Sequence, residues 1–585
     1  MNEVWNLDSI YRGFEDPAFA EDLQKLRDLA KQYTMFPAAL AEMDSVEGLK
    51  TCIRWHEDLT VLALKLYDYA QLRQCADTRD NQAGSYLGQI MQVLSSTAGA
   101  EAVWKAWAAE QPNLKALVEG DEVLKEYRFF FENLHRSSSH LLGEKGEQIA
   151  AMLTMSGSNA WSDMHSYLTS TVPVSYNGET INLSAVRNLA HDADPAVRKA
   201  AYEAELACYD RIKDALAFAM NSIKLETISD CKLRGYVSPL DRTLEQSYVK
   251  RETLEAMLEA MEEYLPAFRR YLKAKAKALG HENGMPWYDL FAPMGSSTSG
   301  YTVESARDLL VELFSTFDGE LAQMVATAFA DAWIDFYPRS GKVGGAFCAD
   351  VSSIGESRVL TNFDGQYSDI VTLAHELGHA FHNQCIRSHR VLNHDYSMPV
   401  AETASTFNEC VVNTAALARA TDRDEKLALL EFQLRDSTQI ICDIYSRYLF
   451  EASVFENRED QFLDAQALCG LMDKAQERSY GDGLDPQVRH AYMWICKPHY
   501  YGPTFYNFPY AFGGLFARGL YAQYEKEGAA FVPKYKKLLY TTPVATAEEA
   551  AAVAGIDLTD KDFWRSALQT IADQIDQFCE LVQQN

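Results

Sequence analysis

The sequence lacks the features that mark secreted, membrane-spanning and nucleic-acid-binding proteins. Its N-terminus, MNEVWNLDSIYRGFEDP, has no basic segment followed by an apolar one, so we expect no signal peptide. No uninterrupted apolar run reaches the ~18 residues of a membrane helix. The 54 Lys and Arg stand against 83 Asp and Glu, a formal charge of −29, whereas binding to phosphate backbones needs a basic surface. We therefore expect no membrane and no nucleic acid among its partners.

The eleven cysteines are odd in number and scattered, and no two of them form a CxxC pair. A zinc ribbon or a thioredoxin-like site is therefore not expected. Scattered unpaired thiols are typical of proteins in a reducing compartment. The sequence predicts a cytoplasmic protein.

The length of the chain, 585 residues, is too great for one ordinary hydrophobic core, so we expect two or more lobes. Hydrophobic residues make up 47% and charged residues 23%, which is the balance of a folded globular protein. Asp194-Pro195 resembles a helix cap with proline at the first helical position. We place the boundary there, which gives predicted domains of residues 1–195 and 196–585.

Most of the chain has the pattern of amphipathic helices. The stretches 251–279, 304–317 and 425–455 combine helix-forming residues with apolar residues three and four apart. We find no fixed-period repeat and no low-complexity linker. The predicted fold class is mainly α.

Two regions have the pattern of sheet. In 172–183, two extended runs flank Asn177-Gly178, which is a strong hairpin signal. In 340–363, glycine-rich turns alternate with short apolar runs. The second region predicts a small sheet just before residue 372.

The stretch TLAHELGHAFH, residues 372–382, is the most informative part of the sequence. A helix interior disfavours glycine by roughly 1 kcal/mol relative to alanine, so helix stability alone does not explain Gly378. Each residue turns the helix by roughly 100°, which places the histidines opposite an apolar stripe of four residues. That stripe consists of Leu373, Ala374, Leu377 and Phe381.

His375 and His379 are one helical turn apart and can bind the same tetrahedral cation. Glu376, offset by roughly 100°, can reach a water on that metal without being a ligand. This is the H-E-x-x-H arrangement of zinc hydrolases. Close packing of another backbone would account for Gly378. The alternative is a solvated polar helix face, and a third protein ligand would decide between them.

The stretch SMPVAETASTFNECVVNTAAL, residues 397–417, predicts a second helix that supplies the third ligand, Glu402. Two histidines and a carboxylate leave a fourth position open, as in catalytic rather than structural zinc sites. Glu409 is then expected to accept a hydrogen bond from a ligand imidazole. His382 is a competing ligand, but it would crowd the same cation.

Two related motifs do not match. The extended H-E-x-x-H-x-x-G-x-x-H motif fails because His382 and Cys385 occupy its glycine and third histidine positions. The segment SGKVGG, residues 340–345, resembles a phosphate loop but lacks the first glycine, which is Phe336, and the Ser or Thr after lysine, which is Val343. We expect no nucleotide site.

At these residues the sequence resembles the oligoendopeptidase F group of the M3, thimet oligopeptidase-like, zinc metallopeptidases. The resemblance is specific at HELGHAFH and at E-x-x-S-x-x-x-E, and it extends to YPRSGKVGGAFC and to the opening WNLDSIYRGFEDPAF. It implies a helical two-lobed ellipsoid with a deep central channel and a small sheet beside the helix pair. It also implies one Zn²⁺ per chain, bound by His375, His379 and Glu402, with Glu376 as general base. Residues 196–585 would form the catalytic zinc metallopeptidase domain, and 1–195 a helical N-terminal lobe.

The resemblance adds further candidate residues. In KPHYYGPTFYNFPYAFGG, residues 497–514, His499, Tyr506 and Tyr510 match most closely the family's hydrogen-bond donors to the substrate carbonyl. Ordinary aromatic core is the alternative, and Phe508 stands where relatives often have tyrosine. The segment GGAFC resembles an edge strand that pairs with substrate backbone, which makes substrate-binding candidates of Gly344, Gly345 and Ala346. A plain hairpin turn is equally consistent with these residues.

The predicted function is zinc-dependent hydrolysis of internal bonds in short, unstructured oligopeptides. A helical metallocarboxypeptidase is the alternative among enzymes, since it also uses H-E-x-x-H and a glutamate. A peptide-binding protein without chemistry is the alternative from another class. The intact Glu376 argues against it, because a binder needs no general base. The sequence does not predict the oligomeric state.

Overall fold

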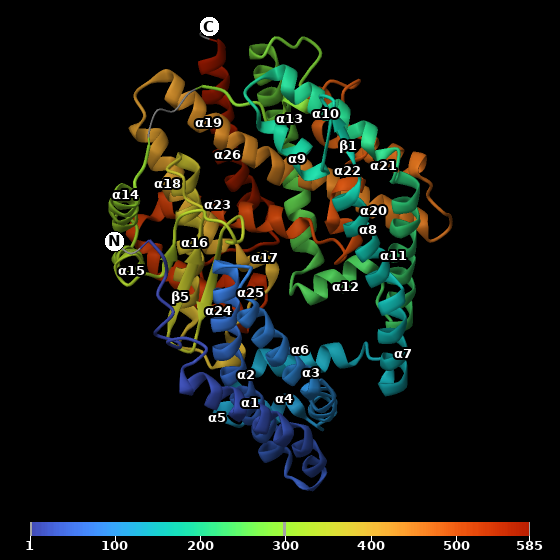
Figure 1. Ribbon diagram of the computed structural model, residues 1–585, viewed down its shortest axis with the longest axis vertical. Coiled ribbons are helices and arrows are strands. Elements are labelled where there is room, and N and C mark those ends of the chain that lie inside the picture. The colour runs from blue at the N-terminus through green and yellow to red at the C-terminus, as the bar shows by residue number, and fades with distance from the viewer. Residues whose placement is uncertain (1–2, 296–299, 584–585) are drawn as a thin grey trace.

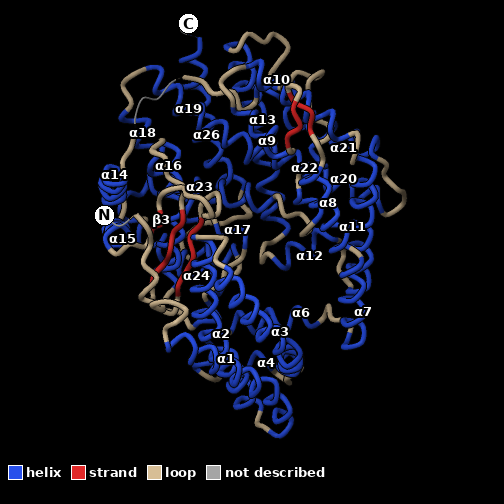
Figure 2. The backbone as a smooth tube through the Cα atoms, viewed as in Figure 1, coloured by secondary structure: helices blue, strands red, loops and turns tan. Residues whose placement is uncertain are grey.

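A computed structural model describes residues 3–295 and 300–583 of the chain. Its described part is mainly helical, with strands confined to two small groups (Figures 1 and 2). The mainly α fold class predicted from the sequence is confirmed. The N-terminal helices lie at one end of the long axis, and the remaining helices fill the rest of the molecule (Figure 1).

The first six helices pack around a hydrophobic core of their own. Aspartate side chains cap the N-termini of four of them, where unpaired backbone N–H groups need acceptors. The core runs from Trp5 to Phe131 and also includes Val351 and Leu360 from the sheet region. The helices are α1 (Pro17–Met35), α2 (Ser45–Ala76), α3 (Asn81–Ala109), α4 (Leu114–Glu119), α5 (Glu122–Glu126) and α6 (Arg128–Ser138).

A second core holds the rest of the molecule together and runs from Val172 to Cys579. The two cores divide between Phe131 and Val172, and the domain boundary near residue 195 stays a prediction. The helices before the sheet are α7 (Gly143–Ser156), α8 (Ser158–Thr171), α9 (Leu183–Asn188), α10 (Pro195–Tyr209), α11 (Lys213–Arg234), α12 (Pro239–Gln246), α13 (Arg251–Ala278), α14 (Val303–Ser315) and α15 (Gly319–Ala330).

The helices that follow the last strand, β5 (Glu356–Leu360), carry the candidate site. They are α16 (Tyr367–Ile386), α17 (Met398–Ala401), α18 (Thr403–Arg419), α19 (Arg423–Thr438), α20 (Ile444–Arg458), α21 (Ala465–Tyr480), α22 (Met493–Cys496), α23 (Phe508–Glu527), α24 (Val532–Thr541), α25 (Ala547–Ala552) and α26 (Lys561–Gln583).

The predicted helices form, with two local differences. α13, α14 and α10 occupy the expected stretches, and the Asp194 side chain accepts a hydrogen bond from the backbone N–H of Ala196 at 2.8 Å, as a helix cap does. The stretch 425–455 is not one regular helix, because the π-helical turn η5 (Gln439–Asp443) separates α19 from α20. The stretch 397–417 divides at Glu402 into α17 and α18.

The predicted hairpin around Asn177-Gly178 is confirmed. Strands β1 (Val174–Tyr176) and β2 (Glu179–Ile181) pair antiparallel across it. Asn177 has a φ of 49° and Gly178 a φ of 81°. Positive φ at both central residues is what a tight two-residue hairpin turn requires, and Asn-Gly is the favoured pair for it.

The predicted sheet before residue 372 is also confirmed, and it has three strands. β4 (Phe347–Val351) pairs antiparallel with β5 (Glu356–Leu360), and β5 pairs in parallel with β3 (Ile334–Asp335), a strand that the sequence pattern did not predict. The strand order β3-β5-β4 leaves β4 at the edge. Both longer strands contact α16, so the sheet lies beside the helix that carries the histidines.

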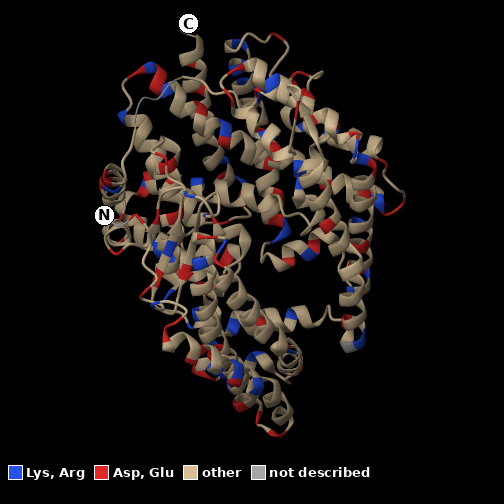
Figure 3. Cartoon of the chain, viewed as in Figure 1, with Lys and Arg blue, Asp and Glu red and all other residues tan. Residues whose placement is uncertain are grey.

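Three further properties of the described residues concern hydropathy, cysteines and charge. No helix in the described residues is long and apolar enough to cross a bilayer. All eleven cysteines are free thiols. Acidic and basic residues are interspersed along the elements rather than gathered by sign (Figure 3).

Candidate metal centre

Helix α16 has one buried apolar face and one face that presents imidazoles. Leu373, Ala374 and Leu377 are completely buried, as the spacing predicted. The side chains of His375 and His379 keep 27% and 19% of their exposure, so both rings remain accessible on the other face. Their ring centroids are 4.9 Å apart, which is the separation of successive turns on one helix face.

Gly378 allows α18 to pack directly against α16. A Cβ atom at this position would lie 2.5 Å from the carbonyl oxygen of Ala404 and 2.5 Å from the Cα of Ser405. Because such contacts are shorter than real Cβ atoms make, any larger residue would push the two helices apart. The close packing expected from the glycine is therefore present, and it brings the start of α18 under the histidines.

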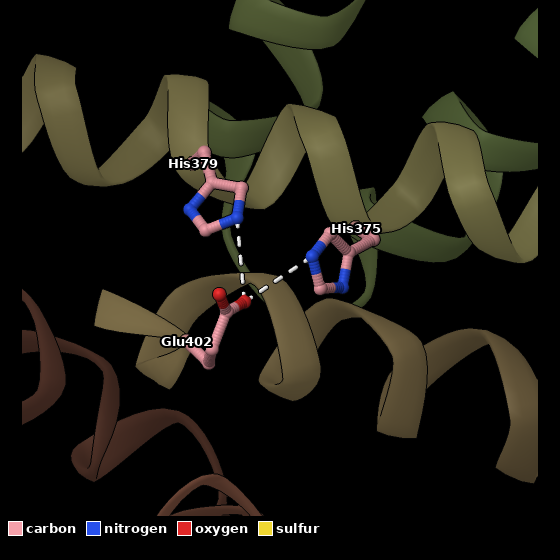
Figure 4. A group of neighbouring side chains, drawn as sticks. All are labelled: His375, His379 and Glu402. Carbon is pink, nitrogen blue, oxygen red and sulfur yellow. Dashed lines mark ion pairs between the residues drawn. The ribbon is translucent and has the colours of Figure 1, made fainter. Parts of the chain in front are cut away.

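Glu402 lies at the junction of α17 and α18 and points at both histidines (Figure 4). Its Oε2 lies 3.2 Å from Nε2 of His375 and 3.4 Å from Nε2 of His379. One donor atom from each residue falls within 4.8 Å of the others. The three residues form a group that can hold one metal ion.

Two neighbouring side chains fix the orientation of this group. Oε1 of Glu409 lies 2.5 Å from Nδ1 of His375, which leaves the other ring nitrogen directed at Glu402. The buried hydroxyl of Ser405 donates to Oε2 of Glu402 at 2.7 Å. Since Ser405 and Glu409 are four residues apart on α18, one face of that helix supplies both contacts.

Within the group, each charged side chain shifts the pKa of its partner toward the charged form. Burial lowers the pKa of His375, but hydrogen bonds to Glu402 and Glu409 outweigh it and raise that pKa to about 10. For Glu402, burial raises the pKa, and both histidines reverse the effect and lower it well below the ordinary value. Two carboxylates thus hold a positive charge between them. A divalent cation is the natural occupant of such a place.

Glu376 is buried and does not belong to the group of three. Burial raises its pKa above that of an ordinary glutamate, although His375 and His379 oppose the shift. A carboxylate with a raised pKa beside a metal-type cluster is suited to accept a proton.

His382 does not join the group of three, although it follows His375 by seven residues on the same helix. Its side chain is completely buried, with Nε2 2.8 Å from Oγ1 of Thr542. Its ring stacks on Tyr396 with centroids 4.1 Å apart. Burial lowers its pKa to about 3, so the ring is neutral. Contacts with distant segments determine the surroundings of this side chain, and helical spacing does not predict such contacts.

His499, Tyr506 and Tyr510 gather into one cluster. The three ring centroids lie 5.6 to 5.9 Å apart, and Tyr510 Oη is 3.5 Å from Nε2 of His499. Tyr510 is exposed in the first turn of α23. Three residues further on, a Cβ on Gly513 would lie 3.0 Å from Cβ of Glu402. The cluster therefore stands beside the glutamate of the metal group.

Two cationic side chains near His499, those of Arg447 and Lys497, were not predicted from the sequence. Burial, Arg447 and Lys497 together lower the pKa of His499 to about 4. Arg447 in turn pairs with the buried Asp443, the last residue of η5. These residues carry no local signal, because an arginine and an aspartate four apart on a helix more often form a surface ion pair.

Gly344, Gly345 and Ala346 lie in the bend before β4, not within the strand, so the predicted strand bounds of 344–348 are wrong at their start. Asn362 holds this bend by donating to the carbonyl oxygen of Gly345 at 2.8 Å. The nearby Lys342 is bound to buried Asp335, with Nζ 2.8 Å from Oδ1. A lysine engaged in this way is not free to bind phosphate, in agreement with the absence of a nucleotide motif.

Comparisons with known proteins agree with this fold and this group of residues. Residues 310–570 match the model of peptidase family M3, and residues 101–172 match the oligopeptidase F model. Oligopeptidase PepF of Bacillus subtilis is 23% identical over 99% of this chain and 87% of its own. The oligoendopeptidase F homolog of Lactococcus lactis is 26% identical over 99% of this chain and 97% of its own.

Solved structures show the same fold. A putative peptidase of Chlamydophila abortus superposes with a TM-score of 0.86 at 21% identity, covering 99% of this chain and 98% of its own. Oligoendopeptidase-F of Enterococcus faecium gives 0.72 at 18% identity, covering 97% and 99%. The fold and the family matches define a metalloendopeptidase. The chain belongs to peptidase family M3, in its oligoendopeptidase F group.

Proposed function

We propose that the protein is a zinc-dependent endopeptidase that hydrolyses internal bonds of short, unstructured oligopeptides. The observation that carries this proposal is the convergence of His375, His379 and Glu402 on one point, with Glu376 between the two histidines on the same helix. Relatives named oligopeptidase and oligoendopeptidase support the substrate class.

The donor set supports zinc as the metal. Two imidazoles and one carboxylate suit Zn²⁺ and leave a coordination position for water. The contact between Glu409 and Nδ1 of His375 is of the kind that orients metal-binding histidines. We therefore propose His375, His379 and Glu402 as the ligands of one Zn²⁺ per chain.

The surrounding residues have separate roles in the proposed reaction. When bound, the zinc would lower the pKa of a water molecule and polarise the scissile carbonyl. Glu376 would take the proton of the attacking water and deliver it to the leaving amine. His499, Tyr506 and Tyr510 would donate hydrogen bonds to the oxygen that becomes negatively charged.

Open space near the segment that leads into the group supports an extended peptide as substrate. A cavity of about 870 Å³ is lined by Met398 and Tyr506, among others. A second, of about 590 Å³, is lined by Tyr396 and Ser397. Both reach the segment that precedes Glu402. Together they favour an extended peptide, rather than a folded protein, as the substrate.

The free edge of β4 supports binding through the peptide backbone. An extended peptide can add to an exposed strand by main-chain hydrogen bonds. Gly344 and Gly345 are exposed at the start of this edge. We propose that they, with Ala346, bind substrate backbone.

We also propose a cytoplasmic location, which the eleven free cysteines support.

The test is mass spectrometry of the products that the protein forms from a mixed peptide library, with and without a chelator. We expect internal cuts that the chelator abolishes and added Zn²⁺ restores. A peptide with a blocked C-terminus should still be cut. Products that always lack one C-terminal residue would indicate a carboxypeptidase. Binding without any product would indicate a peptide-binding protein.

A further inference from the structure

A smaller cavity, of about 250 Å³, lies beside the proposed catalytic residues. Residues of α16 form one wall, and their spacing of three and four places them on the same helix face as Glu376. Side chains of α19 and α23 close the opposite side. The residues that line the cavity include Thr372, His375, Glu376, Phe432, Asp436 and Arg518.

The cavity touches the reacting centre itself. Because His375 and Glu376 both line it, a substrate side chain that enters it belongs to a residue next to the scissile bond. The two larger cavities lie elsewhere, along the segment before Glu402 and around Tyr506. The small cavity is thus placed to distinguish the residue at the cut.

Asp436 presents an unpaired carboxylate to this cavity. It is exposed to solvent there, although protein surrounds it on most sides. Its side chain makes no hydrogen bond or ion pair with another described residue. Burial, strengthened by the nearby Glu409, raises its pKa to about 6, so it is mostly ionised at neutral pH. A carboxylate that solvent reaches and that no side chain pairs with can form an ion pair with a cationic side chain that enters the cavity.

Glu409 and Arg518, two other charged groups of the cavity, each have a hydrogen-bond partner. Glu409 is held by His375, with 2.5 Å between Oε1 and Nδ1. Arg518 is half-buried, and its Nη2 donates to Oγ of Ser437 at 3.2 Å. Glu376 is assigned to the reaction, so Asp436 is the remaining carboxylate of the cavity without a side-chain partner among the described residues. Phe432 adds an apolar wall, on which the methylene stem of a lysine or arginine packs well.

We propose that this cavity binds the side chain of the substrate residue next to the scissile bond, and that Asp436 makes it selective for lysine or arginine. This inference rests on the proposed endopeptidase function. Asp436 would be a specificity-determining residue, which binds the substrate and takes no part in the bond cleavage.

The experiment uses peptides of one sequence that carry Lys, Gln or Glu at each of the two positions flanking the cut. We expect the wild type to prefer Lys over Glu by about tenfold in kcat/KM at one of those positions, as for a charge-assisted hydrogen bond. Asp436→Asn should reduce that ratio to within about threefold. Asp436→Glu should keep the preference. Glu456→Gln, which removes an exposed carboxylate from α20, is the matched control and should keep the wild-type ratio.

Binding gives a second readout that needs no turnover. In a Glu376→Gln background, the affinity for the Lys peptide should fall on Asp436→Asn, and the affinity for the Glu peptide should not. An unchanged Lys-to-Glu ratio in Asp436→Asn would overturn the inference, as would a wild-type preference for Glu, which would indicate Arg518 as the selective group. In either case the peptides are still cut, so the proposed function stands. If no peptide is cut, the proposed function itself fails.

Discussion

Gly378 and Ser405 are in direct backbone contact, because a Cβ on the glycine would lie 2.5 Å from the Cα of the serine. This contact sets the distance between α16 and α18. It thereby places Glu402 at 3.2 and 3.4 Å from the two histidines. The spacing of the metal group depends on a residue that takes no part in it.

Gly378→Ala tests this relationship. The added methyl group meets backbone atoms that cannot rotate away, so we expect a loss of about 1–3 kcal/mol in unfolding free energy and weaker metal binding. Thermal unfolding and metal titration measure the two effects. Gly470→Ala on α21, where nothing lies within 4 Å of a new Cβ, is the control and should be neutral or stabilising. If both variants bind metal as the wild type does, the contact does not control the site.

Glu402→Ala tests the assignment of the third ligand. Removing one of three protein ligands should abolish stoichiometric zinc, while the circular dichroism spectrum keeps its helical form. Metal analysis of purified protein decides the matter. Stoichiometric zinc in this variant would show that Glu402 is not a ligand.

Tyr506→Phe and Tyr510→Phe test the donors to the oxyanion. A hydroxyl that acts mainly in the transition state should change kcat more than KM when it is removed. The loss of one such donor typically costs about 3 kcal/mol of transition-state stabilisation. Steady-state kinetics on a single peptide provides both constants. Unchanged kinetics in both variants would assign these rings to packing alone.

His499→Phe, which removes the ring N–H, tests whether the imidazole acts in its neutral form. Burial and the cations Arg447 and Lys497 hold its pKa at about 4, so the ring is uncharged at every pH well above that value. We expect kcat to fall by about 10²–10³-fold, as for a lost hydrogen-bond donor. The pH profile of kcat should keep its shape between pH 5 and 8, since no group that titrates there has been removed. If the variant loses an ionisation near pH 6–7, the histidine acts instead as a proton donor or acceptor.

Local patterns in the sequence are enough to predict α16. The burial of Leu373, Ala374 and Leu377 follows from helical spacing, and the partner Glu402 follows from a second helix with an opposed polar face. The Asn177-Gly178 hairpin is equally local, because its turn depends on two residues that tolerate positive φ.

Features that depend on distant contacts were not predictable. His382 is placed by Thr542, and its position on the helix alone suggested a ligand. The short strand β3 exists only because β5 pairs with it. Asp436 carries no local signal, since its cavity forms where α16, α19 and α23 meet. The break at Glu402 likewise arises within a stretch of good helix formers.

Glu376→Gln is the measurement that tests the central claim most directly, because it separates the proposed base from the proposed ligands. The substitution keeps the shape of the side chain and leaves His375, His379 and Glu402 intact. On one preparation, zinc content, thermal stability and peptide affinity should stay near wild type, while turnover falls by about 10²–10⁴-fold. Full turnover would contradict the mechanism. Lost zinc would show that Glu376 is itself a ligand.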